Sequence, residues 1–303
     1  MSVHKIKSNL ILLLVAIIWG FAFVAQREGI KYIGPFTFNG IRFALGSISL
    51  IPLMLFNKNM HHSYVNKHGI KRAISSGILA GIILFSASSL QQIGLLGTTA
   101  GKAGFITGLY IVLVPILGII LKQYIGINGW LGAIIATIGL YLLCVTDRFS
   151  ISYYDLLELI GSLLFAIHIL LIDRFSLKVD TLKLAFFQFL TCSVLSMAMA
   201  LFMEKVSLSG IHKSIIPILY GGVFSVGIAY TLQIVGQKNA NPSHAAIILS
   251  FESVFAVIGG TIILNENLGL KGFLGCAFMF TGMLLSQFRS HDKKNMLSDS
   301  ETG

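Results

Sequence analysis

NPSHAAIILSFESVFAVIGGTIILNENL, residues 241–268, decides the fold, because this apolar stretch carries a carboxylate, Glu252, about halfway along its length. An apolar helix of about 20 residues crosses the roughly 30 Å of hydrocarbon in a lipid bilayer. A charge at that depth costs at least about 2.5 kcal/mol, so such residues are usually functional. Glu252 is therefore the first candidate for a binding site, and its mostly apolar helical neighbours disfavour the charged form of the carboxyl.

An earlier stretch, GTTAGKAGFITGLYIVLVP (97–115), repeats this one at an offset of 142 residues. The offset aligns Tyr110 with Glu252 and Gln91 with Gln233. Both stretches have small residues at every fourth position, a spacing that lets helix backbones approach closely. We therefore expect the two stretches to cross, and Tyr110 and Glu252 to face one central cavity.

A second alignment, at an offset of 146 residues, extends the repeat toward the start of the chain. It runs without a gap over residues 34–56 and places Trp19 on Phe165 and Arg42 on Gln188. The chain is therefore predicted to contain two copies of one unit.

Charged residues are scarce, since 11% of the 303 residues are charged and 55% are hydrophobic. About a quarter of the residues in a soluble domain are charged, so the chain is predicted to be a multi-pass protein of the lipid bilayer. No basic stripe with interleaved aromatic residues indicates nucleic-acid binding. The three cysteines lie inside apolar runs without metal-ligand or disulfide spacing, so we expect neither a metal nor a cofactor.

Ten apolar runs are long enough to cross a bilayer. Their approximate bounds are 9–28, 35–56, 73–95, 101–121, 127–145, 154–172, 182–202, 215–236, 243–264 and 270–288. Five spans per unit is an odd number, so the two units must insert with opposite orientation, as in many secondary transporters. The predicted fold is an all-α polytopic membrane protein with ten transmembrane helices in two inverted five-helix repeats, 1–147 and 148–288, followed by a disordered cytoplasmic tail, 289–303.

The basic residues predict the orientation. With the N-terminus inside, fourteen Lys and Arg residues fall in or near inner loops and seven in or near outer loops. Cytoplasmic loops carry the excess of Lys and Arg, so both termini are predicted to be cytoplasmic.

Four motifs resemble the EamA branch of the drug/metabolite transporter superfamily: WGFAFV (19–24), IRFAL (41–45), LQQIGLLGTTAGKAGFITGLYIVLVP (90–115) and LQIVGQKNANPSHAAIILSFESVFAVIGGTIILNENL (232–268). The resemblance covers nearly the whole chain. It implies transport, commonly outward, of small polar or amphipathic metabolites such as amino acids, and a place in the bacterial inner (plasma) membrane. Ser253 replaces a proline of the family pattern, so the sequence does not require the kink that proline gives the family helix.

Arg42 lies about seven residues into the second span, one helical turn after Asn39. It either fixes a substrate carboxylate, with Asn39 beside it, or snorkels toward the outer interface on its long stem. Trp19 lies about eleven residues into the first span, deeper than the aromatic belt at a membrane interface. We predict that both side chains line the pocket.

Gln91 and Gln233 are amides inside spans, where such groups either bridge helices or bind substrate. Their aligned positions favour a shared site with Tyr110 and Glu252, and Glu252 is expected either to contact a cationic group or to exchange a proton. His168, near the middle of the sixth span, reads as a core histidine whose hydrogen bonds are satisfied.

Two other classes of function were weighed against transport. An intramembrane hydrolase needs paired carboxylates, a serine–histidine pair or a metal cluster, whereas Glu252 reads as the only carboxylate at depth, so we do not expect an enzyme. A membrane receptor or scaffold without transport activity stays open as the alternative, and flux of solute into sealed vesicles separates the two.

Overall fold

The computed structural model describes residues 3–60, 67–121, 126–144, 152–264 and 270–287, and the regular structure of these residues is helical. In chain order the helices are α1 (Val3–Gly29), α2 (Pro35–Met60), α3 (Lys67–Gly94), α4 (Ala100–Gly108), α5 (Tyr110–Ile120), α6 (Ile127–Cys144), α7 (Tyr153–Ser176), α8 (Thr181–Met203), α9 (Leu208–Lys213), α10 (Ile215–Leu219), η1 (Tyr220–Tyr230), α11 (Thr231–Gln237), α12 (Pro242–Leu249), α13 (Glu252–Leu264) and α14 (Leu270–Gln287).

Each apolar run predicted from the sequence is helical over most of its length. Within the described residues, eight helical stretches are long and apolar enough to cross a membrane, and two more, Ile127–Leu142 and Leu270–Ser286, are shorter apolar helices. The chain is therefore an all-helical, multi-pass membrane protein. The arrangement of ten spans in two repeats stays a prediction.

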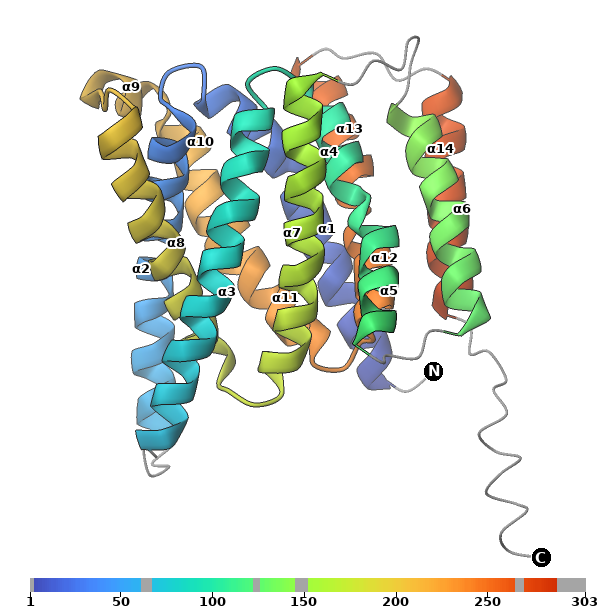
Figure 1. The fold of residues 1–303 in the computed structure, drawn as a ribbon, viewed down its shortest axis with the longest axis horizontal. Coiled ribbons are helices and arrows are strands. Elements are labelled where there is room, and N and C mark those ends of the chain that lie inside the picture. Colours follow the sequence, from blue (N-terminus) through green and yellow to red (C-terminus); the bar gives the residue numbers. More distant parts are fainter. Residues whose placement is uncertain (1–2, 61–66, 122–125, 145–151, 265–269, 288–303) are drawn as a thin grey trace, which may run out of the picture.

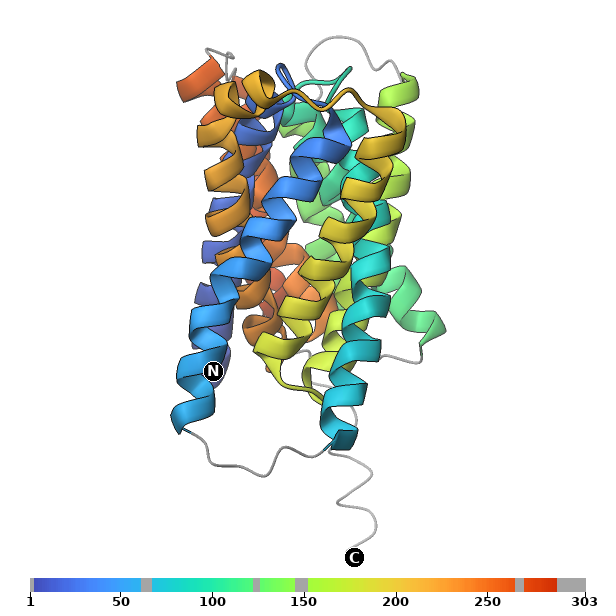
Figure 2. The same ribbon diagram turned by 90° about the vertical axis from the view of Figure 1, so that its left-hand side faces the viewer.

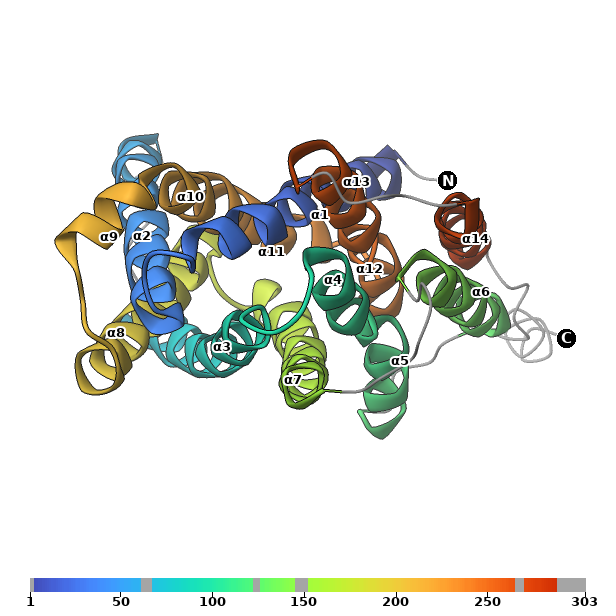
Figure 3. The same ribbon diagram turned by 90° about the horizontal axis from the view of Figure 1, so that it is seen from above.

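The helices lie side by side along one common direction (Figure 1, Figure 2). Helix α1 begins and α14 ends at the same face of the bundle, and α7 begins at the opposite face (Figure 1). We call this opposite face the α7 face. Seen from above, α2 and α8 lie at one side of the molecule, and α6 pairs with α14 at the other (Figure 3). Helix α1 crosses the region between them (Figure 3).

Two of the long apolar stretches are broken near their middle. Helix α4 ends at Gly108 and α5 begins at Tyr110, while α12 ends at Leu249 and α13 begins at Glu252. At each break the backbone tightens, because the amides of Leu109 and Phe251 donate to the carbonyl three residues earlier, at 3.2 Å in both cases. Leu109 and Phe251 are also aligned at the offset of 142 residues, so the breaks fall at matched positions.

The break before Glu252 forms without a proline, and a contact across the bundle lies next to it. The Ser253 hydroxyl, which stands in the place of the proline, donates to the carbonyl oxygen of Gly104 at 2.6 Å. A Cβ atom added at Gly104 would lie 3.2 Å from the Cβ of Ala256, so only a small residue fits. Helices α4 and α13 are therefore in close contact, through Gly104 of the first stretch but through Ser253 and Ala256 of the second rather than through its small residues at every fourth position.

The pair α6 and α14 shows reciprocal contacts between aligned glycines. A Cβ atom added at Gly132 would lie 2.6 Å from the carbonyl oxygen of Gly282, and one at Gly139 would lie 2.6 Å from that of Gly275. The sequence repeat aligns Gly132 with Gly275 and Gly139 with Gly282. Exchanging the two units therefore leaves this set of contacts unchanged, which is the property of a two-fold relation.

Candidate functional site

The two helix breaks bring together the two side chains that the sequence repeat aligned. The Tyr110 hydroxyl donates a hydrogen bond of 2.8 Å to Oε1 of Glu252, and both side chains are buried. Each residue is the first of the helix that follows its break, so the breaks aim both side chains at the same place. A hydrogen bond inside a protein contributes about 0.5–1.5 kcal/mol, which favours this one position of the carboxyl.

Both residues line a cavity in the middle of the bundle, with a volume of about 30 Å³. Six of the seven side chains predicted for the site line it: Trp19, Arg42, Gln91, Tyr110, Gln233 and Glu252. One or two water molecules fill a space of this size. Pockets for small molecules usually measure about 300–1,000 Å³, so a metabolite fits here only after the surrounding helices move apart.

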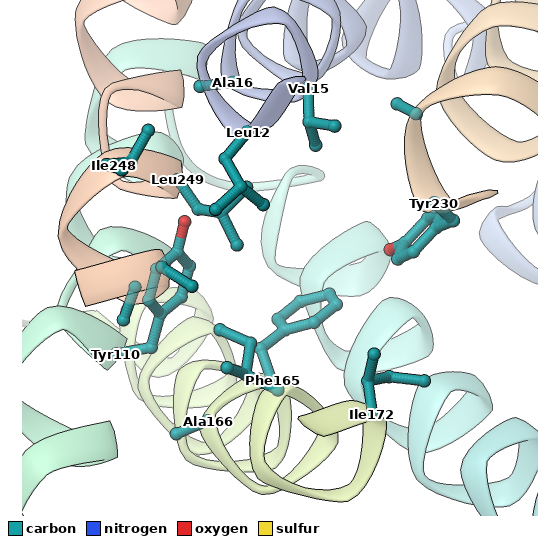
Figure 4. Close-up of a cluster of buried hydrophobic side chains, with 14 of the residues drawn as sticks. Leu12, Val15, Ala16, Tyr110, Phe165, Ala166, Ile172, Tyr230, Ile248 and Leu249 are labelled. Atoms are coloured by element: carbon teal, nitrogen blue, oxygen red, sulfur yellow. The ribbon is translucent and has the colours of Figure 1, made fainter. Parts of the chain in front are cut away.

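Aromatic side chains surround this space. Figure 4 shows Tyr110 and Tyr230 on opposite sides with the ring of Phe165 between them, and all three side chains line the cavity. The walls are therefore mixed, because polar side chains such as Gln26, Thr107 and His168 line the cavity beside the aromatic ones. Polar groups in such a lining can orient a ligand.

Arg42 brings a positive charge into this cavity. Its side chain is 2% exposed, and its guanidinium carbon lies 5.0 Å from the ring centroid of Phe43 and 5.7 Å from that of Phe38. Nε of Arg42 has no hydrogen-bond partner, and the ion pairs found among the described residues do not include Arg42. The side chain therefore does not snorkel to the surface. The two rings contact the cation, but no carboxylate neutralises it.

Trp19 lines the cavity from α1 and contacts an unusual helical segment, η1. Its indole Nε1 donates to the carbonyl oxygen of Ser225 at 3.2 Å, and its ring lies 4.6 Å from that of Tyr230. Ser225 and Tyr230 belong to η1, which is wound as a π-helix over eleven residues. Such winding is rare and occurs frequently at functional sites, so η1 is a candidate for the part of the wall that rearranges.

Gln91 and Gln233 lie at matched positions in the cavity wall but have different partners. The Gln91 amide donates to the Thr107 hydroxyl oxygen at 3.2 Å, whereas Oε1 of Gln233 is buried without a partner. Leaving a buried acceptor unpaired costs about 1–3 kcal/mol. Gln233 is therefore placed to accept a hydrogen bond from a molecule in the cavity.

Asn39 is the one predicted site residue that does not line the cavity. Its amide donates to the carbonyl oxygen of Ser88 at 3.0 Å and so links α2 to α3. Residues three apart on a helix differ by about 60° in direction, which is enough to separate Asn39 from Arg42. We leave Asn39 out of the proposed site.

Other polar residues near the cavity were not assigned to the site from the sequence, where His168 was interpreted as a core histidine. His168 and Tyr230 line the cavity, and Nε2 of His168 lies 3.1 Å from Oε1 of Gln188. The expectation that Glu252 is the only carboxylate at depth is wrong, because Glu158 on α7 is completely buried. Glu158 lies only five residues into its predicted span and reads there as a residue of the membrane interface. The signal available in the sequence was the presence of two carboxylates, Asp155 and Glu158, in the first two turns of α7.

The fold and the cavity define an integral membrane protein with a polar site inside its helical bundle. Comparison with known proteins agrees with this class. The model of the EamA-like transporter family matches residues 6–145 and again residues 152–288. The chain belongs to the EamA-like transporter family and is a membrane transporter. Membership of this family suggests that the protein is not an enzyme.

The relatives span the whole chain. An uncharacterized transporter of Archaeoglobus fulgidus is 30% identical over 290 residues, which cover 95% of this chain and 88% of the relative. The uncharacterized transporter YoaV of Bacillus subtilis is 21% identical over 295 residues, covering 95% of this chain and 99% of the relative. A crystal structure of a protein with 17% sequence identity superposes with a TM-score of 0.75 over 93% of this chain and 96% of the other, and it supports the fold alone.

Proposed function

We propose that the protein is a secondary transporter of small metabolites that carry both a carboxylate and an ammonium group, such as amino acids. One observation carries the proposal: Arg42 and Glu252 line the same buried cavity, and Arg42 has no carboxylate partner among the described residues. A buried charge without a partner costs several kcal/mol, so it is retained where a ligand completes it.

The chemistry of each side chain indicates which group of the substrate it would bind. The guanidinium of Arg42 binds a carboxylate through two parallel hydrogen bonds, which fix its orientation as well as its distance. Glu252, held by the Tyr110 hydroxyl, either contacts the ammonium group or exchanges a proton during the transport cycle. The free acceptor of Gln233 is available to the same ammonium group.

Transport by alternating access requires the cavity to open to one side and then to the other. Broken helices whose ends meet at the binding site are typical of secondary transporters. Here the breaks before Tyr110 and Glu252 lie at the cavity, and η1 forms another part of its wall. We propose that these three segments move, because each already departs from regular α-helix.

The proposed arrangement is ten spans in two inverted repeats, 1–147 and 148–288, with both termini cytoplasmic in a bacterial plasma membrane. Its support is that the family model matches the chain twice, that the helix breaks fall at aligned positions, and that α6 and α14 contact each other reciprocally. Export is the proposed direction, from the family resemblance.

A receptor or scaffold without transport activity is the alternative. A scaffold has no use for an uncompensated charge in a closed cavity, whereas a receptor could bind the same ligand without moving it. The test is to compare, without preselection, the metabolites that accumulate in cells with and without the protein. The solutes that differ are then supplied to sealed proteoliposomes. The proposal predicts flux, and binding without flux would instead identify a receptor.

A further inference from the structure

Glu158 is a second buried carboxylate that the proposed binding site does not use. It lies on α7 and is completely buried. Its Oε2 accepts a hydrogen bond of 3.2 Å from the Thr107 hydroxyl, while Oε1 has no hydrogen-bond partner. A buried carboxyl with an unpaired oxygen and no cation in contact is costly, so its presence requires a reason.

Packing does not supply that reason, because the repeat provides a comparison within the chain. Glu158 packs against Gly94, where an added Cβ atom would lie 2.6 Å from Cγ of Glu158. The offset of 146 residues aligns Glu158 with Leu12, and the offset of 142 aligns Gly94 with Gly236. Leu12 indeed packs against Gly236, where an added Cβ atom would lie 2.9 Å from its Cγ. A leucine therefore fills the aligned place, and packing there needs no carboxyl.

On one side, Glu158 connects to the cavity. Its donor Thr107 also accepts a hydrogen bond of 3.2 Å from the Gln91 amide, and both of these side chains line the cavity together with Glu252. A hydroxyl can pass a proton on, because it donates and accepts at the same time. The cavity has room for one or two water molecules beside these groups, so Thr107 and a space large enough for water separate Glu158 from Glu252.

On the other side, Glu158 lies one helical turn from the α7 face. Asp155 precedes it by three residues on α7 and forms an ion pair of 2.7 Å with Lys102, whose side chain is 34% exposed. Thr98 donates to the other oxygen of Asp155 at 3.3 Å. Asp155 and Glu158 are three residues apart and so lie on neighbouring turns of one side of α7, although none of the hydrogen bonds among the described residues joins them.

The titratable groups around Glu158 come from four helices. Asp155 on its own helix and Glu252 on α13 act on Glu158 directly, Lys102 on α4 and Tyr110 on α5 are the partners of those two carboxyls, and the nearest residues of α3 are not titratable. Lys102 is paired with Asp155 and Tyr110 with Glu252. Among the ion pairs of the described residues, none involves Glu158, so its protonation can change.

We propose that Glu158 binds a proton and carries it between the α7 face and Glu252. A proton from water at the α7 face binds a carboxylate oxygen of Glu158. The carboxyl then gives it to the Thr107 oxygen while the hydroxyl proton passes to water in the cavity next to Glu252, so that only O–H bonds form and break. The aligned residue Leu12 cannot carry a proton, so this route serves the α7 face alone.

The predicted orientation makes the α7 face the outer face, because α1 starts in the cytoplasm and ends there. A proton route from outside to the cavity suits export driven by proton entry, and this consequence rests on the proposed function. The route itself does not, since proton exchange at Glu252 is measurable without any substrate. Failure of the route and failure of transport are therefore distinguishable.

The test is infrared spectroscopy of the full-length protein in lipid nanodiscs, transferred from H₂O to D₂O. The C=O band of protonated Glu252 is identified by its loss in Glu252→Gln, and its shift in D₂O reports proton exchange. We expect Glu158→Leu and Glu158→Gln to slow this exchange by about a hundredfold, the lower end of what a positioned acid–base group contributes. Glu28→Gln, at a surface ion pair with Lys31, is the matched control and should leave the rate unchanged.

Two results would overturn the proposal. One is exchange at Glu252 within twofold of the wild-type rate in both Glu158 variants. The other is a wild-type spectrum in which no carboxyl band assigned to Glu158 changes with pH. If Glu158→Leu does not fold, Glu158→Gln, which keeps the shape of the side chain, decides alone.

Discussion

Replacing Arg42 by methionine separates a binding role from a structural one, because the two roles predict opposite effects on stability. In the structure the guanidinium gains two contacts with aromatic rings, at 5.0 and 5.7 Å from their centroids. A desolvated contact of this kind contributes about 2 kcal/mol. Burying the Arg42 charge away from water costs several kcal/mol, more than the ring contacts contribute, and no carboxylate among the described residues pairs with it.

Methionine keeps the length and apolar packing of the arginine stem while it removes the charge. Replacing buried charged groups by apolar residues of similar volume is often neutral or stabilises by about 1–4 kcal/mol. We therefore expect Arg42→Met to unfold at the same temperature as the wild type or higher. Substrate flux should be lost, because truncating one partner of a buried charge pair costs about 2–5 kcal/mol of binding.

The matched control is Gln188→Met, at the position that the repeat aligns with Arg42. Gln188 accepts a hydrogen bond of 3.1 Å from His168, so its loss leaves a buried imidazole nitrogen without a partner. That costs about 1–3 kcal/mol, which is offset in part because Nε2 of Gln188 is itself buried without a partner, so the midpoint of thermal unfolding should fall modestly. Both variants are measured in the same detergent by thermal unfolding, and flux is measured in proteoliposomes. A midpoint for Arg42→Met as low as that of Gln188→Met would refute the reasoning and make Arg42 structural.

Three further changes test other parts of the structure. Glu252→Gln keeps the shape of the side chain but cannot exchange a proton, so flux in proteoliposomes should lose its dependence on pH, and an unchanged pH response would remove Glu252 from the mechanism. Ser253→Ala removes the 2.6 Å hydrogen bond to Gly104 and should lower stability by about 1 kcal/mol, measured against the exposed control Ser75→Ala; equal midpoints would show that the bond does not hold the helix break. A cysteine placed at residue 295 of a chain lacking its own three cysteines should react only with reagents on the cytoplasmic side, and outward labelling would contradict the inverted repeat.

The internal repeat is the reason that much of the cavity can be predicted from sequence. Aligned positions in two related units lie at related places in the bundle, so the offset of 142 residues paired Tyr110 with Glu252 before any geometry was known. The same argument covers Gln91 and Gln233, which both line the cavity. The functional roles of these side chains stay predictions.

The features that the sequence could not predict involve contacts between segments that are distant in the chain. The break before Glu252 has no local signal such as proline, and the Ser253 hydroxyl beside it meets a carbonyl oxygen about 150 residues away in the chain, at Gly104. Asn39 shares a helix with Arg42 but faces α3, because a separation of three residues turns the side chain about 60° away. Glu158 cannot be recognised as buried from the sequence, because its position near the start of a span does not reveal how deeply its side chain lies inside the bundle.

The most direct test of the central claim is counterflow into proteoliposomes loaded with a metabolite extract, with the accumulated solutes identified by mass spectrometry. The account predicts that wild-type vesicles accumulate solutes carrying both an ammonium and a carboxylate group, and that Arg42→Met vesicles of equal protein content do not. Wild-type vesicles that accumulate no solute, or that accumulate solutes without a carboxylate equally well in both proteins, would contradict it.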